Sequence, residues 1–166
     1  ANTMVVGKND VDIWRSFIQF DFDGFNPSYI VTESYLRLYY RDVVPSEIKL
    51  ELLLADSEWQ EHNITHLNRP SPIDLVTNEF TVNKEQGYIE FNVFDITNQW
   101  IDNLRENNGF VLRVANESLP GQASFYTRET NSPPELVVKY YDSRIFSQGR
   151  SQVTTEIFIE RHAEND

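Results

Sequence analysis

Tyrosine side chains are the residues of this sequence best suited to chemistry with a ligand. A tyrosine ring offers an apolar face on which the C–H face of a sugar stacks, while neighbouring carboxylates or amides bind the sugar hydroxyls. Alternation along residues 32–42 places Tyr35 and Tyr39 on one face of a strand and Tyr40 on the other. The candidate carbohydrate-binding residues are Tyr35, Tyr39, Tyr88, Tyr126, Arg128 and Glu129.

These residues also have a structural interpretation. Tyrosine is common at half-buried sheet positions, so a single ring is more often part of the sheet than a ligand platform. Arg128 and Glu129 follow an aromatic strand and can pair across strands with Arg113. The sequence favours this register role, because Pro133 and Pro134 already require a defined turn nearby.

Two aspartates, Asp21 and Asp23, lie two residues apart at the end of an expected strand and are the candidate metal ligands. Paired carboxylates suit acid–base chemistry or Ca²⁺, and calcium is the one cofactor that the sequence suggests. The favoured alternative is structural, since a strand-end carboxylate accepts hydrogen bonds from the following turn. His62 and His66 have the spacing of a helical metal pair, but their segment lacks a helical pattern and predicts a surface loop.

Known catalytic motifs do not occur in the sequence. It contains no cysteine, which removes disulfides, iron–sulfur clusters and thiol nucleophiles. There is no Gly-rich phosphate loop, no GxSxG turn and no Ser/His/Asp spacing of a hydrolase. We therefore do not expect an enzyme.

Charge and composition limit the partners. With 14 basic and 26 acidic residues, the formal net charge is −12, which disfavours nucleic acid and anionic membrane surfaces. No run of about 18 apolar residues occurs, so we expect no membrane insertion. These properties are typical of a secreted or surface protein, and we expect an extracellular or cell-surface location.

Strand patterns dominate the chain. Alternating segments predict strands over residues 14–22, 32–42, 49–56, 88–97, 110–116, 123–129 and 135–141. About seven strands with a turn every ten residues or so predict an all-β fold, an antiparallel β-sandwich of jelly-roll type with one short helix.

The short helix is expected between residues 95 and 107. Its apolar positions have helical spacing, and Asp95 or Thr97 is the expected N-cap. The apolar residues that define it are Ile96, Trp100, Ile101 and Leu104. The tryptophans Trp14, Trp59 and Trp100 stand in apolar patterns and are expected in the core.

Six pieces of the chain, in order, resemble the DNRLRE-type domain, which is similar to carbohydrate-binding module family ninety-six. They are FIQFDF, VTESYLRLYY, DSEWQEHNITHLNRP, FNVFDITNQW, NNGFVLR and FYTRETNSPPELVVKYY, spread over residues 17–141. The resemblance implies a jelly-roll module that binds a polysaccharide without catalysis. It also implies that Trp59 and Trp100 occupy core positions and that Asp21 is a strand-end aspartate at a corner.

The chain departs from the family pattern at both ends. Residues 1–141 correspond to the β-sandwich domain, in which the first family strand has no counterpart. Residues 142–166 form a C-terminal extension with an alternating, strand-like segment that includes Val153, Thr155, Ile157 and Ile159. This segment has three interpretations: a tail or the start of a following domain, a strand that fills its own sheet edge, or a strand donated to a neighbour.

Two functions are consistent with these features. The first is a non-catalytic extracellular module with a surface-structural or adhesive role, a subunit of a filament, spore or phage appendage that self-associates through its C-terminal strand. The alternative is a monomeric carbohydrate-binding module that recognises a polysaccharide. The missing first strand favours the former, and the family resemblance favours the latter.

Overall fold

The computed structural model describes residues 3–23, 25–44, 48–60, 63–82, 84–127, 130–146, 153–158 and 161–164. In this part of the chain, strands dominate and all strand pairs are antiparallel. The elements are β1 (Thr3–Lys8), β2 (Ile13–Trp14), β3 (Ser16–Gln19), β4 (Tyr29–Val44), β5 (Lys49–Ala55), β6 (Pro72–Thr81), η1 (Lys84–Gln86), β7 (Tyr88–Asn92), α1 (Phe94–Ile101), β8 (Phe110–Val114), β9 (Gly121–Tyr126), β10 (Glu135–Asp142), α2 (Ser143–Phe146), β11 (Val153–Phe158) and β12 (Arg161–Glu164).

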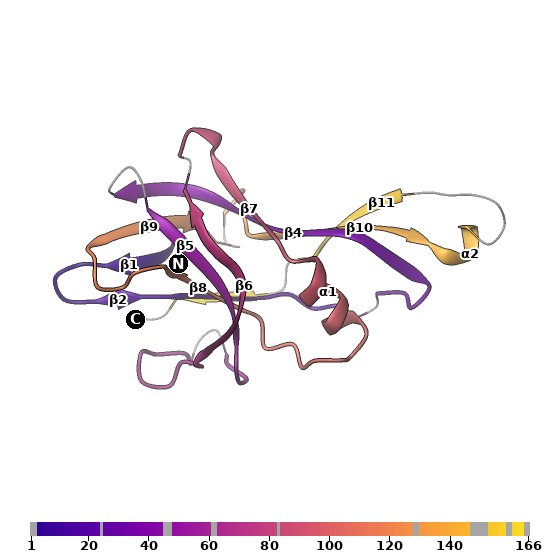
Figure 1. Cartoon of the computed structure of the whole chain (residues 1–166), viewed down its shortest axis with the longest axis horizontal. Coiled ribbons are helices and arrows are strands. Elements are labelled where there is room, and N and C mark those ends of the chain that lie inside the picture. The colour runs from indigo at the N-terminus through magenta and orange to yellow at the C-terminus, as the bar shows by residue number, and fades with distance from the viewer. Residues whose placement is uncertain are drawn as a thin grey trace.

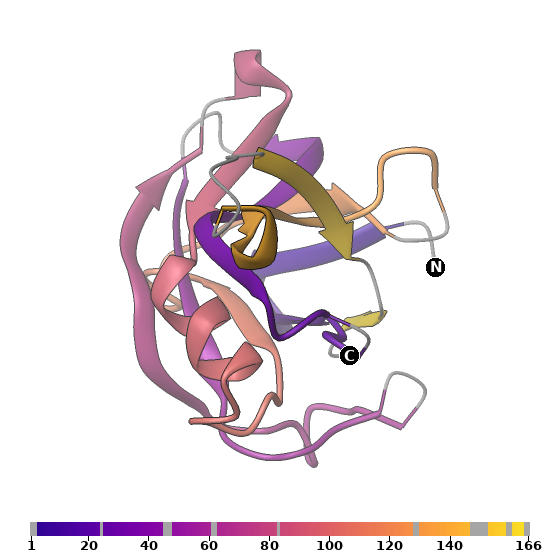
Figure 2. The same ribbon diagram turned by 90° about the vertical axis from the view of Figure 1, so that its right-hand side faces the viewer.

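Two sheets face each other and form a sandwich (Figures 1 and 2). The larger sheet has the order β11-β10-β4-β9-β1-β2, with β7 also paired to β4. The smaller sheet has the order β12-β3-β8-β5-β6. The prediction of an all-β antiparallel sandwich with a short helix is confirmed. Among the described residues, every helix is too short or too polar to span a lipid bilayer.

Strand β4 is the longest strand and organises the larger sheet. It pairs with β10 through residues 29–37, with β7 through residues 35–39 and with β9 through residues 40–44. Because β7 and β10 both pair with residues 35–37, they flank the middle of β4 on opposite sides. The predicted alternation is confirmed: Leu36, Leu38 and Tyr40 are buried, whereas the odd-numbered side chains between residues 35 and 39 are half-buried on the outer face.

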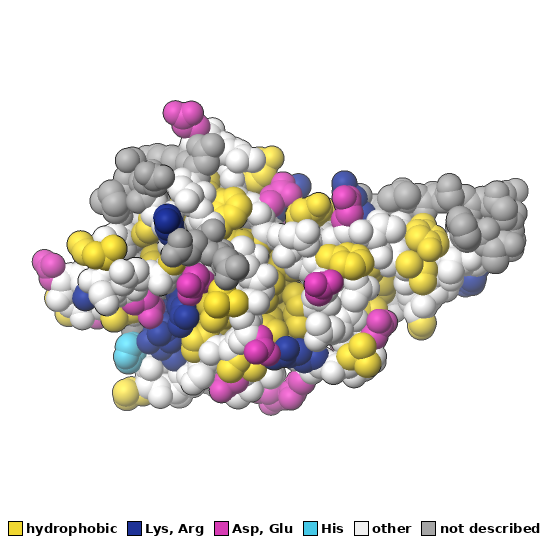
Figure 3. Space-filling model, in the orientation of Figure 1, with side chains coloured by type: hydrophobic (Ala, Val, Ile, Leu, Met, Phe, Trp, Pro, Cys, Tyr) yellow, Lys and Arg dark blue, Asp and Glu magenta, His cyan; other side chains and the backbone are white. Residues whose placement is uncertain are grey.

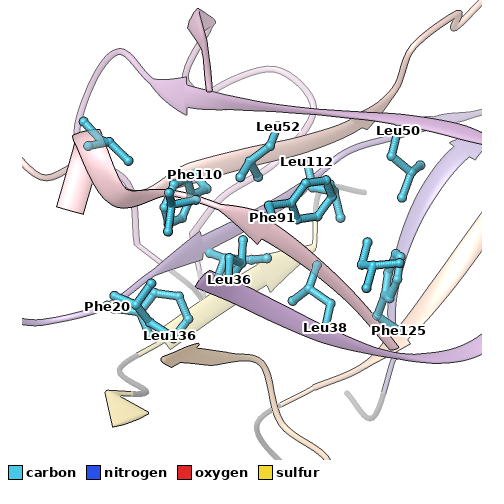
Figure 4. Close-up of a cluster of buried hydrophobic side chains, with 14 of the residues drawn as sticks. Phe20, Leu36, Leu38, Leu50, Leu52, Phe91, Phe110, Leu112, Phe125 and Leu136 are labelled. Atoms are coloured by element: carbon cyan, nitrogen blue, oxygen red, sulfur yellow. The ribbon is translucent and has the colours of Figure 1, made fainter. Parts of the chain in front are cut away.

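The main core lies between the two sheets. Ten of its side chains, from strands of both sheets and the adjoining turns, are labelled in Figure 4: Phe20, Leu36, Leu38, Leu50, Leu52, Phe91, Phe110, Leu112, Phe125 and Leu136. Each is at most 1% exposed, and burying one side chain of this size contributes about 1.5–3 kcal/mol. The sandwich therefore rests on apolar burial between the layers.

A second apolar cluster covers the outer face of the smaller sheet. Phe17, predicted on the face opposite to Ile18, is fully buried beneath Trp59 from the β5–β6 connection. Their rings meet edge to face at 5.8 Å, and the Trp59 indole Nε1–H donates to the Asn108 carbonyl at 2.7 Å. The prediction of a buried Trp59 is confirmed, whereas that of a buried Trp14 is wrong, because Trp14 is half-buried at the β1–β2 hairpin opposite Gly7.

Helix α1 ends earlier than its sequence pattern predicts. Ile96 and Trp100 are buried as expected, but Leu104 lies outside the helix and is 77% exposed. The chain leaves the helix because Asn103 takes a left-handed backbone conformation with φ 56°, a common way to end a helix. The N-cap residue is Val93, which makes no side-chain cap, so the predicted caps are wrong; the Asn92 Oδ1 accepts the Phe94 N–H at 3.1 Å. Thr97 instead shares a buried hydrogen bond of 2.8 Å with Ser34.

An ion pair joins the β2–β3 connection to the β8–β9 turn. The Arg15 guanidinium donates to both carboxylate oxygens of Glu117, at 3.0 and 2.8 Å. Burial raises the pKa of Glu117. Hydrogen bonds from Arg15 and the positive charges of Arg15 and Arg113 lower this pKa by a larger amount, so the pKa lies below its ordinary value.

Acid is therefore expected to remove a stabilising contribution of Glu117. Because the folded-state pKa is lower than the unfolded one, the contribution is present above about pH 4.5 and is lost as pH falls through the folded-state pKa. Glu117→Gln should make the free energy of unfolding fall less steeply between pH 5 and pH 3, measured by urea unfolding. Glu106→Gln, at an exposed position, is the control. An unchanged acid limb in Glu117→Gln would contradict the assignment.

Candidate functional site

A polar and aromatic group lies on the outer face of the larger sheet, where β7, β4 and β10 run side by side. The register places Tyr39 opposite Tyr88, and it places Arg37 opposite Glu90 on β7 and opposite Glu135 on β10. Residues opposite each other in antiparallel strands share a face, so these side chains meet. We call this group the tyrosine platform, made of Tyr35, Arg37, Tyr39, Tyr88, Glu90 and Glu135.

Arg37 is the centre of the tyrosine platform. Its Nε donates to Glu90 at 3.2 Å and its Nη1 to Glu135 at 3.3 Å, and its guanidinium carbon lies 5.4 Å from the Tyr88 ring centroid. Partial burial lowers the pKa of Arg37, but hydrogen bonds and charges from Tyr39 and Glu90 raise it above the ordinary value. Arg37 thus stays charged and holds both carboxylates in place.

Two of the three tyrosine rings of the platform form a pair. The Tyr39 and Tyr88 ring centroids are 6.0 Å apart with planes inclined at 59°, and the Tyr39 hydroxyl donates to Glu135 at 3.2 Å. Both tyrosines are half-buried, and the side chains of Arg37 and Glu90 are each 29% exposed. The platform therefore combines accessible ring surface with fixed donors and acceptors, which suits a polyhydroxylated ligand.

Of the other predicted sugar-binding residues, Tyr126 lies at the margin of the platform. It is half-buried on β9 opposite Thr3 and follows Phe125, which pairs with Tyr40 of β4, so the register places it beside Tyr39. Arg128 and Glu129 lie outside the described residues. Arg113, their expected partner, instead donates to Glu51 on the neighbouring strand β5 at 3.0 Å.

The sequence pattern predicts the three tyrosines of the platform as binding residues, but it does not predict the charged residues of the platform. The alternation of residues 88–92 puts Tyr88 and Glu90 on one face of a strand. The register that brings them to Arg37 comes from pairing across more than fifty residues of chain. Alternation alone does not specify that register, so it could not bring Glu90 and Glu135 to one site.

Asp21 and Asp23 lie at one end of the sandwich, after strand β3. The Asp21 Oδ1 accepts the backbone N–H of Asp23 at 2.8 Å, as the strand-end interpretation expects. Among the described residues, no three histidine, cysteine, aspartate or glutamate side chains come together as a metal site. A calcium site at these aspartates stays a prediction. His66 is exposed on the β5–β6 connection, and His62 lies outside the described residues.

An open hollow of about 810 Å³ lies beside these aspartates. It is formed by the turn after β3 and by the segment that follows α1, and we call it the end hollow. It is lined by Gln19, Phe20, Asp21, Phe22, Asp23, Phe25, Pro27, Tyr29, Trp100, Ile101, Asp102, Asn103 and Asn107. Two hydrogen bonds of 2.7 Å join its walls: Gln19 donates to the Asn107 carbonyl, and Asn107 donates to the Phe20 carbonyl.

The C-terminal extension lies along the two sheets of its own domain. β11 pairs with β10, and β12 pairs with β3. In the backbone register Val153, Thr155 and Ile157 stand opposite Tyr141, Lys139 and Val137. Ile159 lies outside the described residues. Figure 1 shows β10, β11 and α2 extending together away from the body of the sandwich.

Acidic and basic side chains are interspersed over the face shown in Figure 3.

The comparisons with known proteins agree with the β-sandwich fold. No curated protein matches the chain. The model of the family described as carbohydrate-binding module family 96 matches residues 1–140, which covers the sandwich up to β10 and includes the whole tyrosine platform and the whole end hollow. The chain therefore belongs to carbohydrate-binding module family 96.

Proposed function

We propose that this protein is a non-catalytic module that binds a polysaccharide on its tyrosine platform. The observation that carries the proposal is the Tyr39–Tyr88 ring pair, flanked by a guanidinium and two carboxylates on an open sheet face. Sugars present apolar C–H faces and hydroxyl edges together, so rings with fixed polar neighbours match both. Family membership supports a carbohydrate ligand.

The shape of the platform favours a chain over a single sugar. A flat sheet face contacts a ligand from one side, whereas small ligands are usually surrounded by a concave pocket. A polysaccharide compensates for one-sided contact by extending over several rings, here Tyr35 as well as the Tyr39–Tyr88 pair. An extracellular or cell-surface location follows as part of this proposal, since such polysaccharides occur there.

Affinity electrophoresis tests this function. The whole chain is run through gels that contain soluble glucans, mannans, xylans, galactans or polyuronates, beside gels without polysaccharide. Retardation by at least one polysaccharide, confirmed by calorimetry, is the expected result. Unchanged migration in every gel would contradict carbohydrate binding, and release of shorter saccharides during the run would contradict a non-catalytic role.

Assembly by strand exchange is a second candidate function, and the pairing of β11 with β10 and of β12 with β3 supports it. A strand that pairs with its own sheet edge makes the same backbone hydrogen bonds when it pairs with the same edge of another copy. Surface assembly would then use the extension as the exchanged element, with Val153, Thr155, Ile157 and Ile159 as its alternating residues.

Removal of the extension tests strand exchange. The whole chain is expected to form concentration-dependent dimers or fibres in light scattering and negative-stain microscopy, while a chain that ends at Tyr141 forms no such ordered fibres. Monomers of the whole chain at all concentrations would exclude strand exchange and leave glycan binding unaffected.

A further inference from the structure

We infer that the end hollow is a second saccharide site, separate from the tyrosine platform, that takes a short or terminal sugar unit. This inference rests on the proposed glycan-binding function, but it concerns different residues. A volume of about 810 Å³ is within the usual range for a small-molecule site, and it is large enough for two or three sugar rings.

The lining of the end hollow combines the groups that a sugar requires. The Phe22 and Trp100 ring centroids lie 6.2 Å apart with planes inclined at 45°, and both residues line the hollow together with Asp23, Asp102 and Asn103. These three polar residues are exposed at the rim. Their carboxylate and amide oxygens accept hydrogen bonds from hydroxyls, while the half-buried Phe22 ring offers apolar contact.

Trp100 forms a closed part of the wall of the end hollow. Its side chain lines the hollow but is only 5% exposed, and its indole Nε1–H is buried without a hydrogen-bond partner in the described part of the chain. A ligand in the hollow does not reach this buried donor. The apolar contact with a sugar therefore comes from the half-buried Phe22 ring.

The walls of the end hollow are held in a fixed shape. Gln19 and Asn107 link the two walls through hydrogen bonds to backbone carbonyls, each of 2.7 Å. Asn103, at the rim, takes the left-handed conformation with φ 56° that ends helix α1. A site of fixed shape loses little entropy on binding, which favours a small ligand.

The two sites are separated along strand β4. Tyr29, at the beginning of β4, lines the end hollow, and the platform residues Tyr35 and Tyr39 follow six and ten residues later on the same strand. At about 3.3 Å per residue these separations are roughly 20 and 30 Å. One polysaccharide chain that reaches both sites would bind more tightly than either site alone binds a short saccharide.

Binding of tetrasaccharides of glucose, mannose, xylose, galactose and uronic acids, measured by calorimetry and by the indole N–H resonances, tests the inference. Phe22→Leu removes a ring that lines the hollow at a half-buried position and keeps an apolar side chain there, so its melting temperature should fall by only a few degrees. We expect this variant to bind the best tetrasaccharide at least about fivefold more weakly, the value of one ring contact. In the wild type, an indole N–H resonance should shift on saturation, because Trp100 lines the hollow.

Tyr88→Ala distinguishes binding at the platform from binding at the end hollow. Asp102→Asn is a second variant of the end hollow, at an exposed position. The inference is supported if Asp102→Asn also weakens tetrasaccharide binding and Tyr88→Ala retains it. It is overturned if no tetrasaccharide binds the wild type at millimolar concentration, or if a folded Phe22→Leu binds as tightly as the wild type. Polysaccharide binding that survives in Tyr88→Ala but is lost in Phe22→Leu would instead contradict the platform as the main site.

Discussion

Replacing the two paired tyrosines of the platform, in the double variant Tyr39→Ala with Tyr88→Ala, is expected to weaken polysaccharide binding by ten- to a hundredfold. Each ring contributes stacking of about 1 kcal/mol beyond its buried area, and tenfold in affinity corresponds to about 1.4 kcal/mol. The rings also position Arg37 and Glu135, so the polar contacts weaken with them. The measurement is calorimetry with the polysaccharide that gives the strongest retardation.

Tyr141→Ala is the matched control for this variant. Tyr141 is a half-buried tyrosine of the same sheet, opposite Ile30 on β4, and it follows Glu135 by six residues along β10, roughly 20 Å away. It should retain wild-type affinity. Equal loss in Tyr141→Ala and in the double variant would mean that the effect comes from destabilised sheet structure and not from a binding site.

Gly109→Ala is expected to lower the free energy of unfolding by about 2–5 kcal/mol. Gly109 has φ +80°, and a Cβ there would lie 2.5 Å from the Ile18 carbonyl oxygen. The left-handed conformation costs an alanine about 1–2 kcal/mol, and overpacking against a strand adds about 1–3 kcal/mol. Urea unfolding followed by circular dichroism measures the change.

Comparison with Gly87→Ala isolates the contribution of the close contact between the new Cβ at residue 109 and the Ile18 carbonyl. Gly87 has a nearly identical φ of +82°, but a Cβ there meets nothing within 4 Å. Its substitution should lower the free energy of unfolding by only about 1–2 kcal/mol. If both variants lose the same amount, contact with strand β3 is not the reason why this turn has a glycine.

The sequence predicted what depends on local periodicity. Alternation placed Tyr35 and Tyr39 opposite Tyr40 because side chains along a strand alternate between faces wherever the strand is regular. Periodicity gave a wrong end for α1. Leu104 has helical spacing, but it follows Asn103, where the backbone takes a left-handed conformation and the helix has ended. Trp14 failed for a related reason: an apolar pattern does not reveal that its strand is only two residues long at a hairpin.

The site depends on contacts distant in sequence, which periodicity does not encode. The platform needs the register of β7 and β10 on β4, and that register is fixed by packing of the core face. The end hollow needs the segment after β3 and the segment after α1, about 80 residues apart, to meet through Gln19 and Asn107. The sequence therefore presents Asp21 and Asp23 as a local pair and does not show that they line the end hollow.

Mapping of the bound polysaccharide by backbone amide chemical shifts is the decisive test of binding at the tyrosine platform. The isotope-labelled whole chain is titrated with the polysaccharide that it binds best. We predict that the largest shifts occur at residues 35–39 of β4, residues 88–90 of β7 and Glu135 of β10, and that they disappear in the double tyrosine variant. Shifts that leave these strands untouched, or no shift with any polysaccharide, would contradict it.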